Sequence, residues 1–220
     1  MTEQSRSIGK NVEGVYTARQ DRSRRSRDAF IESGIVLLNE MRFDDLKVSE
    51  LARHSGRSVG SFYKRFEDKE AFFRALRAAV VTRDRSIIAT RLSQDRLETL
   101  SSEDVMNEMV DTLADIFTSE VRGVLRESLL RILDPEDVWE PMRESGRQVQ
   151  QRIVDRFRSE PSILSEEHTE RKIRFCYQII AGVLQNDLVN DFHIFSTKDT
   201  SIRIALKAAL TDHMNSGSSY

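Results

Sequence analysis

Apolar residues recur along much of this chain at intervals of three and four positions, the spacing of one face of an α-helix. Phe30, Gly34, Leu37, Leu38 and Met41 follow this spacing and predict a helix over roughly 22–41. The same period continues in segments within 101–117, 120–133, 135–157, 166–189 and 199–213, and Pro135 is the expected first residue of the helix that carries Trp139. No segment alternates apolar and polar residues as a half-buried strand does. The pattern predicts an all-α protein of about nine helices.

Two short helices follow the first one. The stretch VSELARHSG places Val48, Leu51 and Ala52 on one face and ends at Gly56, a residue suited to helix termination. Ser58 follows as a candidate N-cap, whose oxygen accepts an amide hydrogen two or three residues later. Two short helices with a tight turn between them have the spacing of a helix-turn-helix, whose second helix enters the DNA major groove.

The stretch SVGSFYKRFEDKE predicts two different faces for the second short helix. Phe62 and Phe66 are four residues apart and are expected to point inward. The opposite face suits DNA, because Gly60 lets amides at the helix N-terminus approach a phosphate and the other residues reach bases or phosphates. A core with an ordinary solvated face is the alternative. The outer face comprises Val59, Gly60, Tyr63 and Lys64.

A longer helix follows the stretch FEDKE. Asp68 is its expected N-cap, and Lys69 lies in its first turn, within reach of a DNA backbone. Its inner stripe is formed by Phe72, Phe73, Leu76 and Val80.

Charge is distributed unevenly along the chain. Residues 1–85 hold 18 basic and 13 acidic residues, and the remainder holds 16 basic and 23 acidic residues. This asymmetry favours an anionic partner for the first third, although helical proteins also segregate charge without function. Five arginines lie between Arg19 and Arg27. They form either a solvated face or, with the aperiodic residues before them, an arm that contacts phosphates or the minor groove.

The sequence contains no constellation that supports catalysis, a metal or a cofactor. Cys176 is the single cysteine, no glycine-rich phosphate loop is present, and the histidines are scattered at His54, His168, His193 and His213. The first 20 residues lack the apolar core of a signal peptide, and no run of about 18 apolar residues occurs. We therefore expect a cytoplasmic protein that is not an enzyme.

Residues 24–76 resemble the N-terminal domain of the tetracycline-repressor (TetR) family of bacterial transcriptional regulators. The stretch ELARHSGRSVGSFYKRFEDKEAFF carries the resemblance. It implies a homodimer built largely on the last two helices, a divergent effector-binding domain and, usually, repression relieved by a ligand. The matching positions are Leu51, Ala52, Gly56, Ser58, Gly60, Tyr63, Phe66, Lys69, Glu70 and Phe72.

Three positions depart from the family pattern. Arg42 stands where a glycine commonly ends the first helix, so that turn is expected to close differently. Lys47 replaces a capping threonine, a role that Asp45 or Ser49 could take, and could itself contact phosphate. Arg57 replaces an apolar turn residue, which either weakens packing or adds a cation for DNA.

The C-terminal two-thirds of the chain offers candidates for ligand binding and dimerisation. Large side chains on predicted helices could line an apolar cavity with polar anchors, although such aromatics are more often core. Gly182 lies mid-helix, where glycine costs about 1 kcal/mol relative to alanine, and a close helix approach would explain it. The effector candidates are Phe117, Trp139, Arg143, Phe175, Tyr177 and Gln178, and the dimer candidates are Ile180, Gly182, Leu184, Leu188, Ile204 and Leu206.

Together these features predict a basic arm (1–21), a three-helix DNA-binding domain (22–70), a ligand-binding and dimerisation domain (71–214) and a tail (215–220). The expected function is that of a homodimeric transcriptional regulator, most simply a repressor released from its operator by a partly apolar small molecule. An all-helical module whose basic N-terminal third binds an acidic protein partner is the alternative. The DNA-contacting residues are expected to be Lys47, Arg57, Ser58, Val59, Gly60, Ser61, Tyr63, Lys64, Arg65 and Lys69.

Overall fold

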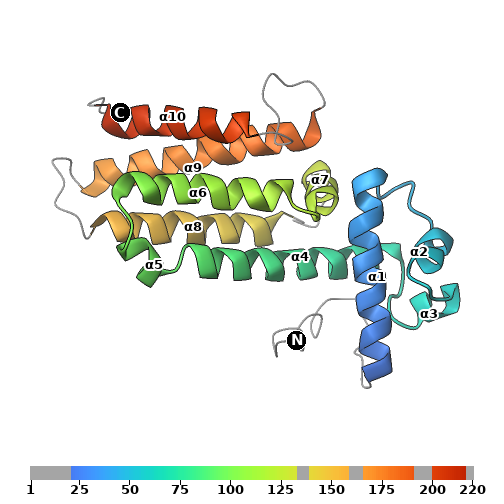
Figure 1. Ribbon diagram of the computed structural model, residues 1–220. Coiled ribbons are helices and arrows are strands. Elements are labelled where there is room, and N and C mark those ends of the chain that lie inside the picture. Colours follow the sequence, from blue (N-terminus) through green and yellow to red (C-terminus); the bar gives the residue numbers. More distant parts are fainter. Residues whose placement is uncertain (1–20, 133–138, 159–165, 191–199, 217–220) are drawn as a thin grey trace. The chain divides into compact units, whose positions relative to one another are not determined.

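The computed structural model describes residues 21–132, 139–158, 166–190 and 200–216, and these residues form helices and connecting turns (Figure 1). They separate into two compact units. Unit 1 contains the described residues up to Arg83 together with Glu120–Arg131, and unit 2 contains Asp84–Ser119 and the described residues from Ile132 onward. The long helix α4 (Lys69–Arg91) therefore contributes to both units.

Unit 1 is built around a cluster of phenylalanine rings. Phe30, Phe62, Phe66 and Phe72 are fully buried, and successive pairs among them have ring centres 5.1–6.1 Å apart. Aromatic rings at such separations gain favourable edge-to-face contacts in addition to burial. The helices of unit 1 are α1 (Asp21–Glu40), α2 (Val48–His54), α3 (Val59–Tyr63), the first part of α4, and α7 (Arg122–Leu130).

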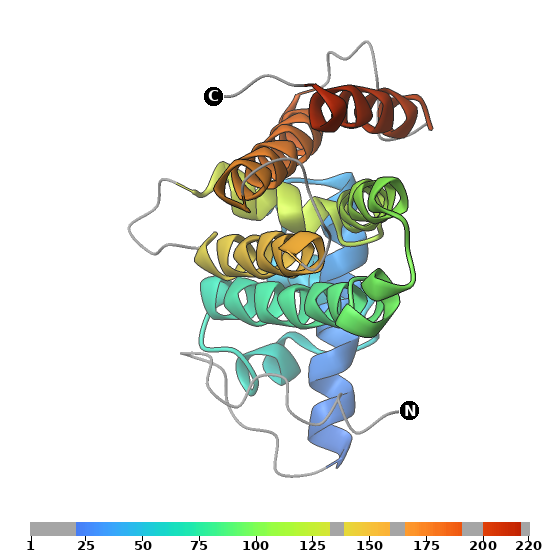
Figure 2. The same cartoon turned by 90° about the vertical axis from the view of Figure 1, so that its left-hand side faces the viewer.

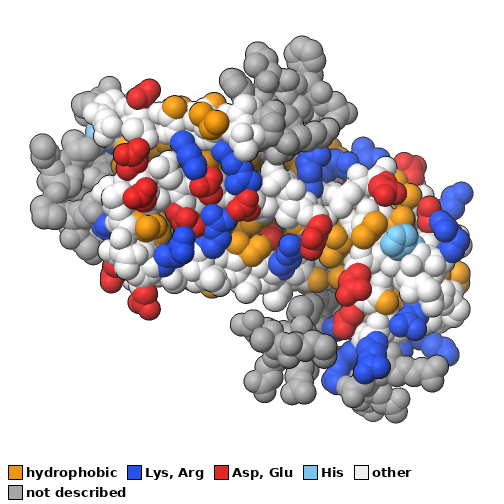
Figure 3. Space-filling view, in the orientation of Figure 1, with side chains coloured by type: hydrophobic (Ala, Val, Ile, Leu, Met, Phe, Trp, Pro, Cys, Tyr) orange, Lys and Arg blue, Asp and Glu red, His pale blue; other side chains and the backbone are white. Residues whose placement is uncertain are grey.

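Unit 2 is a bundle of longer helices (Figures 1 and 2). In it α9 packs against α6, α8 and α10, and α10 also packs against α6. Ion pairs join α6 to α4 and to α10. Acidic and basic side chains intermingle on the surface over α4 and α6 (Figure 3). Its helices are the last part of α4, α5 (Gln94–Glu98), α6 (Ser102–Thr118), α8 (Glu140–Arg158), α9 (Glu166–Val189) and α10 (Ser201–Asn215).

The all-α prediction is confirmed, and the long helices lie where the periodicity places them. The described residues form ten helices, and the one not predicted is α5. It has only five residues, too few to show a helical period, and begins at Ser93, whose side chain caps the amide of Arg96. Ser101 caps α6 by accepting from the amide of Asp104.

Some predictions fall on residues outside the described ranges. The expected arm and Arg19 lie there, as does Pro135, the proposed first residue of the helix that carries Trp139. In the structure α8 begins at Glu140. The later arginines of the basic run are part of α1, and Arg27 is 9% exposed and bonds to Asp28 at 3.0 Å.

None of the helices described is both long and apolar enough to cross a bilayer. Within the described residues, no three His, Cys, Asp or Glu side chains gather closely enough to hold a metal ion.

Candidate functional site

The turn between α2 and α3 closes as the sequence predicts. Gly56 has a φ of +66°, a backbone conformation that side chains with a Cβ rarely adopt. Its amide donates to Arg53 O at 3.2 Å, and the amide of Arg57 donates to Ala52 O at 2.9 Å. These bonds satisfy carbonyls at the end of α2 and bring the chain directly into α3.

The start of α3 is capped by Ser58, whose hydroxyl accepts the amide hydrogen of Ser61 at 3.2 Å. Phe62 anchors the helix in the ring cluster, as predicted. Phe66 also points inward but lies beyond the end of α3, in a turn that its amide closes by donating to Phe62 O at 3.0 Å. Thus α3 is held from one side only.

The opposite side of α3 faces solvent. Val59 is 40% exposed and Tyr63 is 52% exposed, so neither side chain is buried in the core. Gly60 has nothing within 4 Å of the position that a Cβ would occupy. The exposed residues on and beside this face are Lys47, Arg57, Ser58, Val59, Gly60, Tyr63 and Lys64, and we name them the α3 face.

Three of the residues predicted to contact DNA are instead engaged within the unit. Lys69 is directed inward, because its ammonium group donates to the carbonyl oxygens of Phe43, Asp44 and Leu46 at 2.9–3.2 Å. Ser61 shares a hydrogen bond with Ser26 of α1 at 3.0 Å. Arg65 is half-buried and donates to Lys64 O at 3.0 Å. The phosphate-anchor prediction for Lys69 is therefore replaced by a structural role, since its donors already have acceptors.

The beginning of α2 lacks the side-chain cap that the sequence analysis considered. Lys47 occupies the N-cap position, and its side chain makes no capping hydrogen bond. Its backbone carbonyl accepts from the amides of Glu50 and Leu51 at 3.0 Å. Lys47 is exposed, so its ammonium group stays available for an anionic partner.

Unit 2 contains a cavity of about 260 Å³. Four of the six effector candidates line it, namely Phe117, Trp139, Arg143 and Tyr177. The other two lie elsewhere: Phe175 is 43% exposed with its ring 5.2 Å from that of His213, and Gln178 is exposed. Phe175 and Gln178 lie close in sequence to residues of the inner face of α9. Each residue turns the helix by about 100°, so a difference of one position is enough to move a side chain off that face.

The cavity also contains residues that the sequence analysis missed. Gly146 faces Tyr177 so closely that a Cβ there would lie 2.2 Å from the tyrosine hydroxyl. Burial raises the pKa of Tyr177, so its phenol stays neutral. Asp84 is 1% exposed in the wall of the cavity. Other residues of the lining are Ile88, Leu113, Ile116, Met142, Ser145, Arg147, Val149, Gln150, Ala181 and Gln185.

The two arginines of the lining are bound to carboxylates of their own helix. Arg143 donates to Glu140 at 2.9 Å, and Arg147 donates to Glu144 at 2.7 Å and also to Glu140. Hydrogen bonds from Arg147 and then from Arg143 lower the pKa of Glu140. The arginine charges are thereby balanced, and the wall is mainly apolar and aromatic with scattered polar groups, as in many small-molecule sites.

The dimer candidates divide into core and surface residues. Ile180, Leu184, Leu188 and Leu206 are at most 4% exposed within the chain itself, so they are core residues and not surface that a partner could contact directly. Gly182 is exposed, with open space where a Cβ would lie, and Ile204 is 66% exposed. Val183 and Val189, both 38% exposed, are further apolar surface residues of α9.

Comparison with known proteins gives two findings. Residues 30–76 match the model of the family described as bacterial regulatory proteins, tetR family. Among proteins with curated functions, none matches the chain.

Solved structures share the fold over most of the chain. A TetR-family protein from Rhodococcus sp. is 17% identical, with a TM-score of 0.61 over 86% of this chain and 99% of its own. A TetR-family protein from Vibrio parahaemolyticus is 18% identical, with a TM-score of 0.57 over 84% and 97%. NalD, the secondary repressor of the MexAB-OprM multidrug efflux pump in Pseudomonas aeruginosa, is 17% identical, with a TM-score of 0.52 over 87% and 97%.

Proposed function

We propose that this chain, which residues 30–76 identify as a member of the tetR family of bacterial regulatory proteins, is a homodimeric repressor. It binds operator DNA through the α3 face. It releases the DNA when a small molecule enters the cavity of unit 2. The observation that carries this proposal is the solvent exposure of Val59, Gly60, Tyr63 and Lys64 on a helix whose other side is anchored by Phe62.

The chemistry of the α3 face suits the major groove. Lys64 and Tyr63 are long side chains with donors for phosphates or base edges, and Val59 offers methyl groups for a thymine methyl. Lys47 and Arg57 add exposed cations at the starts of α2 and α3. Each phosphate that such a cation neutralises strengthens binding at low salt.

The cavity supports the effector part of the proposal. Phe117, Trp139 and Tyr177 supply aromatic walls, and Gln150 and Gln185 supply neutral polar groups. This composition fits a small, partly apolar molecule. NalD is itself described as a repressor, which favours the same role here, acting on DNA in the cytoplasm.

The homodimer part rests on the apolar surface of α9 and α10. A DNA-binding dimer places two recognition helices one duplex turn apart. Gly182 and Ile204 are the expected contact residues on this surface, joined by Val183 and Val189. The buried leucines beneath them support these helices from inside the chain.

Selection of DNA provides the test. The wild-type protein is incubated with a pool of duplexes carrying a random 30-base-pair centre, bound duplexes are amplified, and the enriched duplex is used in gel shifts. We expect enrichment of an inverted repeat that binds at 150 mM salt with a Kd below about 10⁻⁷ M. A folded dimer that enriches no sequence, and instead binds an acidic polypeptide such as polyglutamate, would support the protein-interaction alternative.

A further inference from the structure

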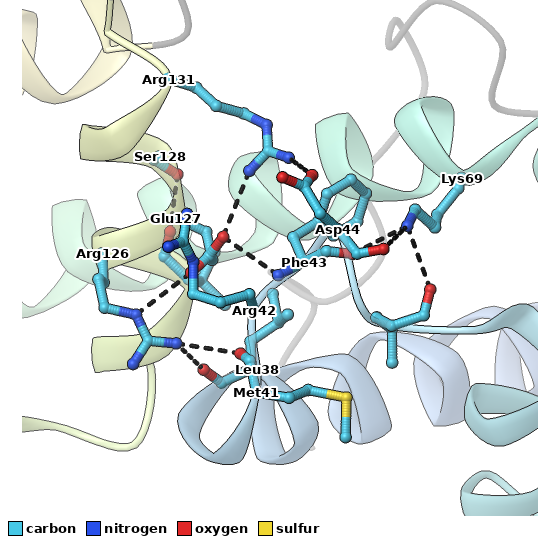
Figure 4. A network of polar contacts seen from close by, with 12 residues as sticks. Leu38, Met41, Arg42, Phe43, Asp44, Lys69, Arg126, Glu127, Ser128 and Arg131 are labelled. Carbon is cyan, nitrogen blue, oxygen red and sulfur yellow. Dashed lines mark hydrogen bonds and ion pairs between the residues drawn. The ribbon is translucent and has the colours of Figure 1, made fainter.

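A buried carboxylate lies in α7. Glu127 is 0% exposed, and burial of a charge is unfavourable unless partners compensate it. Here it accepts hydrogen bonds from Arg42 Nε at 2.7 Å, from the Phe43 amide at 3.1 Å, and from Arg126 and Arg131 at 3.2 and 3.3 Å (Figure 4). Two of these donors, Arg42 and Phe43, belong to the turn between α1 and α2.

The arginines around Glu127 hold the same turn at further points. Arg126 donates to the carbonyl oxygens of Leu38 and Met41, at the end of α1, at 2.8 and 3.0 Å. Arg131 pairs with Asp44, and its guanidinium carbon lies 4.8 Å from the centre of the Phe43 ring (Figure 4). Every group in this network belongs to unit 1.

The backbones of α7 and α1 also meet directly. A Cβ at Gly123 would lie 2.2 Å from Leu38 O, so no larger residue fits there without a backbone shift. The amide of Gly123 donates to Asn39 Oδ1 at 2.8 Å, and Asn39 Nδ2 donates to Glu120 O at 2.6 Å. Two independent features, close backbone contact and a buried ionic network, therefore join α7 to the end of α1.

The network also accounts for the unusual residue at position 42. A glycine there would leave Glu127 without its closest donor, because only a side chain as long as that of Arg42 supplies the Nε contact. Phe43, the next residue, is fully buried, with its ring centre 4.4 Å from that of Phe73 of α4. The turn is thus fixed between α7 and α4, and α2 and α3 begin directly after it.

We propose that Glu127 is a positioning residue for DNA binding: it makes α7 part of the DNA-binding unit and sets the placement of α2 and α3 through the α1–α2 turn. The chain enters α7 from α6 and returns to unit 2 at Ile132. Phe117 of the cavity wall lies three residues before Glu120. This inference rests on the proposed DNA-binding function.

The test compares Glu127→Gln with Glu120→Gln, using the duplex that the wild type selects. Glu120 is an exposed carboxylate beside α7 that pairs with Arg83 at 2.6 Å, so it controls for the loss of one charge. We expect Glu127→Gln to raise Kd about tenfold, the scale of one charge-assisted hydrogen bond. Hydrogen exchange at residues 41–47 should accelerate, while Glu120→Gln changes neither value.

Salt dependence separates positioning from contact. Removing a residue that touches a phosphate reduces the magnitude of the slope of log K against log salt by about 0.9. Glu127→Gln should keep the wild-type slope, whereas Lys64→Ala should lower it. Arg42→Met gives a second measurement, because the Arg42 side chain is 50% exposed, so its replacement opens no cavity, and three other donors to Glu127 remain. It should weaken binding in the same direction, and combining it with Glu127→Gln should add little.

Different failures point to different conclusions. A wild-type protein that selects no duplex contradicts the proposed function and not this inference alone. A wild type that binds DNA, with Glu127→Gln folded and equal in affinity, overturns the positioning role. If Glu127→Gln unfolds, Arg42→Met decides: unchanged affinity and unchanged exchange at residues 41–47 would reduce Glu127 to an ordinary stabilising residue.

Discussion

The ammonium group of Lys69 lies 4.7 Å from the centre of the Phe43 ring and donates to the carbonyl oxygen of the same residue at 2.9 Å. With two further acceptors, Asp44 O and Leu46 O, this one side chain ties the first turn of α4 to the loop before α2. Lys69 thus stabilises unit 1 from within, and a cation next to residues that are proposed to face DNA need not be a DNA contact.

Replacing Lys69 by methionine should destabilise the protein. The variant keeps the aliphatic stem but leaves three carbonyls, two of them partly buried, without their charged donor, at a cost of about 2 kcal/mol. Chemical denaturation should show this loss, and the salt slope of DNA binding should stay at the wild-type value. Lys64→Met is the matched control, since Lys64 is exposed and should change DNA affinity without changing stability. Equal stability of both variants would contradict the assignment.

Tyr63→Ala and Lys64→Ala should each weaken binding to the selected duplex, by about tenfold. Tyr63 is 52% exposed. Among the ring pairs described, it meets the phenylalanine cluster only at Phe62, edge to face, with the ring centres 5.3 Å apart. Thermal unfolding and sedimentation should therefore show a folded dimer in both variants. If Tyr63→Ala loses as much stability as a core truncation does, Tyr63 acts as a core residue and not as a DNA contact.

Trp139 should report occupation of the cavity. It is the single tryptophan of the chain, it is 4% exposed, and it lines the cavity. Titration with the neutral dye N-phenyl-1-naphthylamine should quench its emission by energy transfer. Ala181→Leu, which adds volume to the lining, should weaken dye binding, and Ala208→Leu on the exposed side of α10 is the control. Equal quenching in both variants would place the dye outside the cavity.

Unit 2 should lose stability in acid through carboxylates of α6. Burial alone would raise the pKa of Glu108, but hydrogen bonds from Arg91 and then Arg96 outweigh it and lower that pKa below its usual value. Burial would likewise raise the pKa of Asp115, but hydrogen bonds from Arg203 and then Arg91 outweigh it and lower that pKa below its usual value. A carboxyl group whose folded pKa is depressed stabilises the fold above its unfolded pKa, about 4, and loses this effect as pH falls through the folded pKa.

The melting temperature should therefore decline between about pH 5 and pH 3. Asp115→Asn should be less stable at pH 7 and show a flatter decline, because it no longer releases a proton on folding. The exposed Asp212→Asn serves as control and should follow the wild-type curve. Parallel curves for Asp115→Asn and the wild type would rule out this source of acid sensitivity.

Cys176 should be unreactive in the folded protein. Burial raises the pKa of its thiol to about 12, so almost no thiolate exists at pH 8. Reaction with 5,5′-dithiobis(2-nitrobenzoate) should be slow in buffer and fast in urea. A Gln178→Cys variant that also carries Cys176→Ser places the thiol on the exposed side of α9 and should react quickly in both conditions. Rapid labelling of native Cys176 would show that α9 opens.

Several features of the DNA-binding unit were predictable because they are local. Gly56 and Ser58 lie within three residues of the groups that they serve, so a turn glycine and a cap are visible in the sequence. Phe62 and the exposed α3 face follow from a helical period of 3.6 residues. The same argument works less well for Phe175 and Gln178 on α9. This long helix packs against several other helices, and the sequence pattern alone does not show which of its faces meets which helix.

Other features depend on residues distant in the chain. Lys69 carries a charge that suits DNA, and only the position of the Phe43, Asp44 and Leu46 carbonyls shows that it points inward. Ile180 and Leu184 have the apolar character of interface residues, and only their burial against other helices of unit 2 shows that they are core. In both cases chemistry in the sequence permits two roles, and the surrounding atoms select one.

The sequence by itself determined the all-helical class, the short-helix pair of α2 and α3, and the two faces of α3, because helix periodicity and capping act over a few residues. The tertiary structure decided that α7 belongs to the DNA-binding unit, that Arg42 closes its turn on Glu127, and that Gly146 faces Tyr177 in the cavity. Those partners lie 85 and 31 positions apart, and no local pattern records which distant backbone or side chain will fill the space beside a given residue.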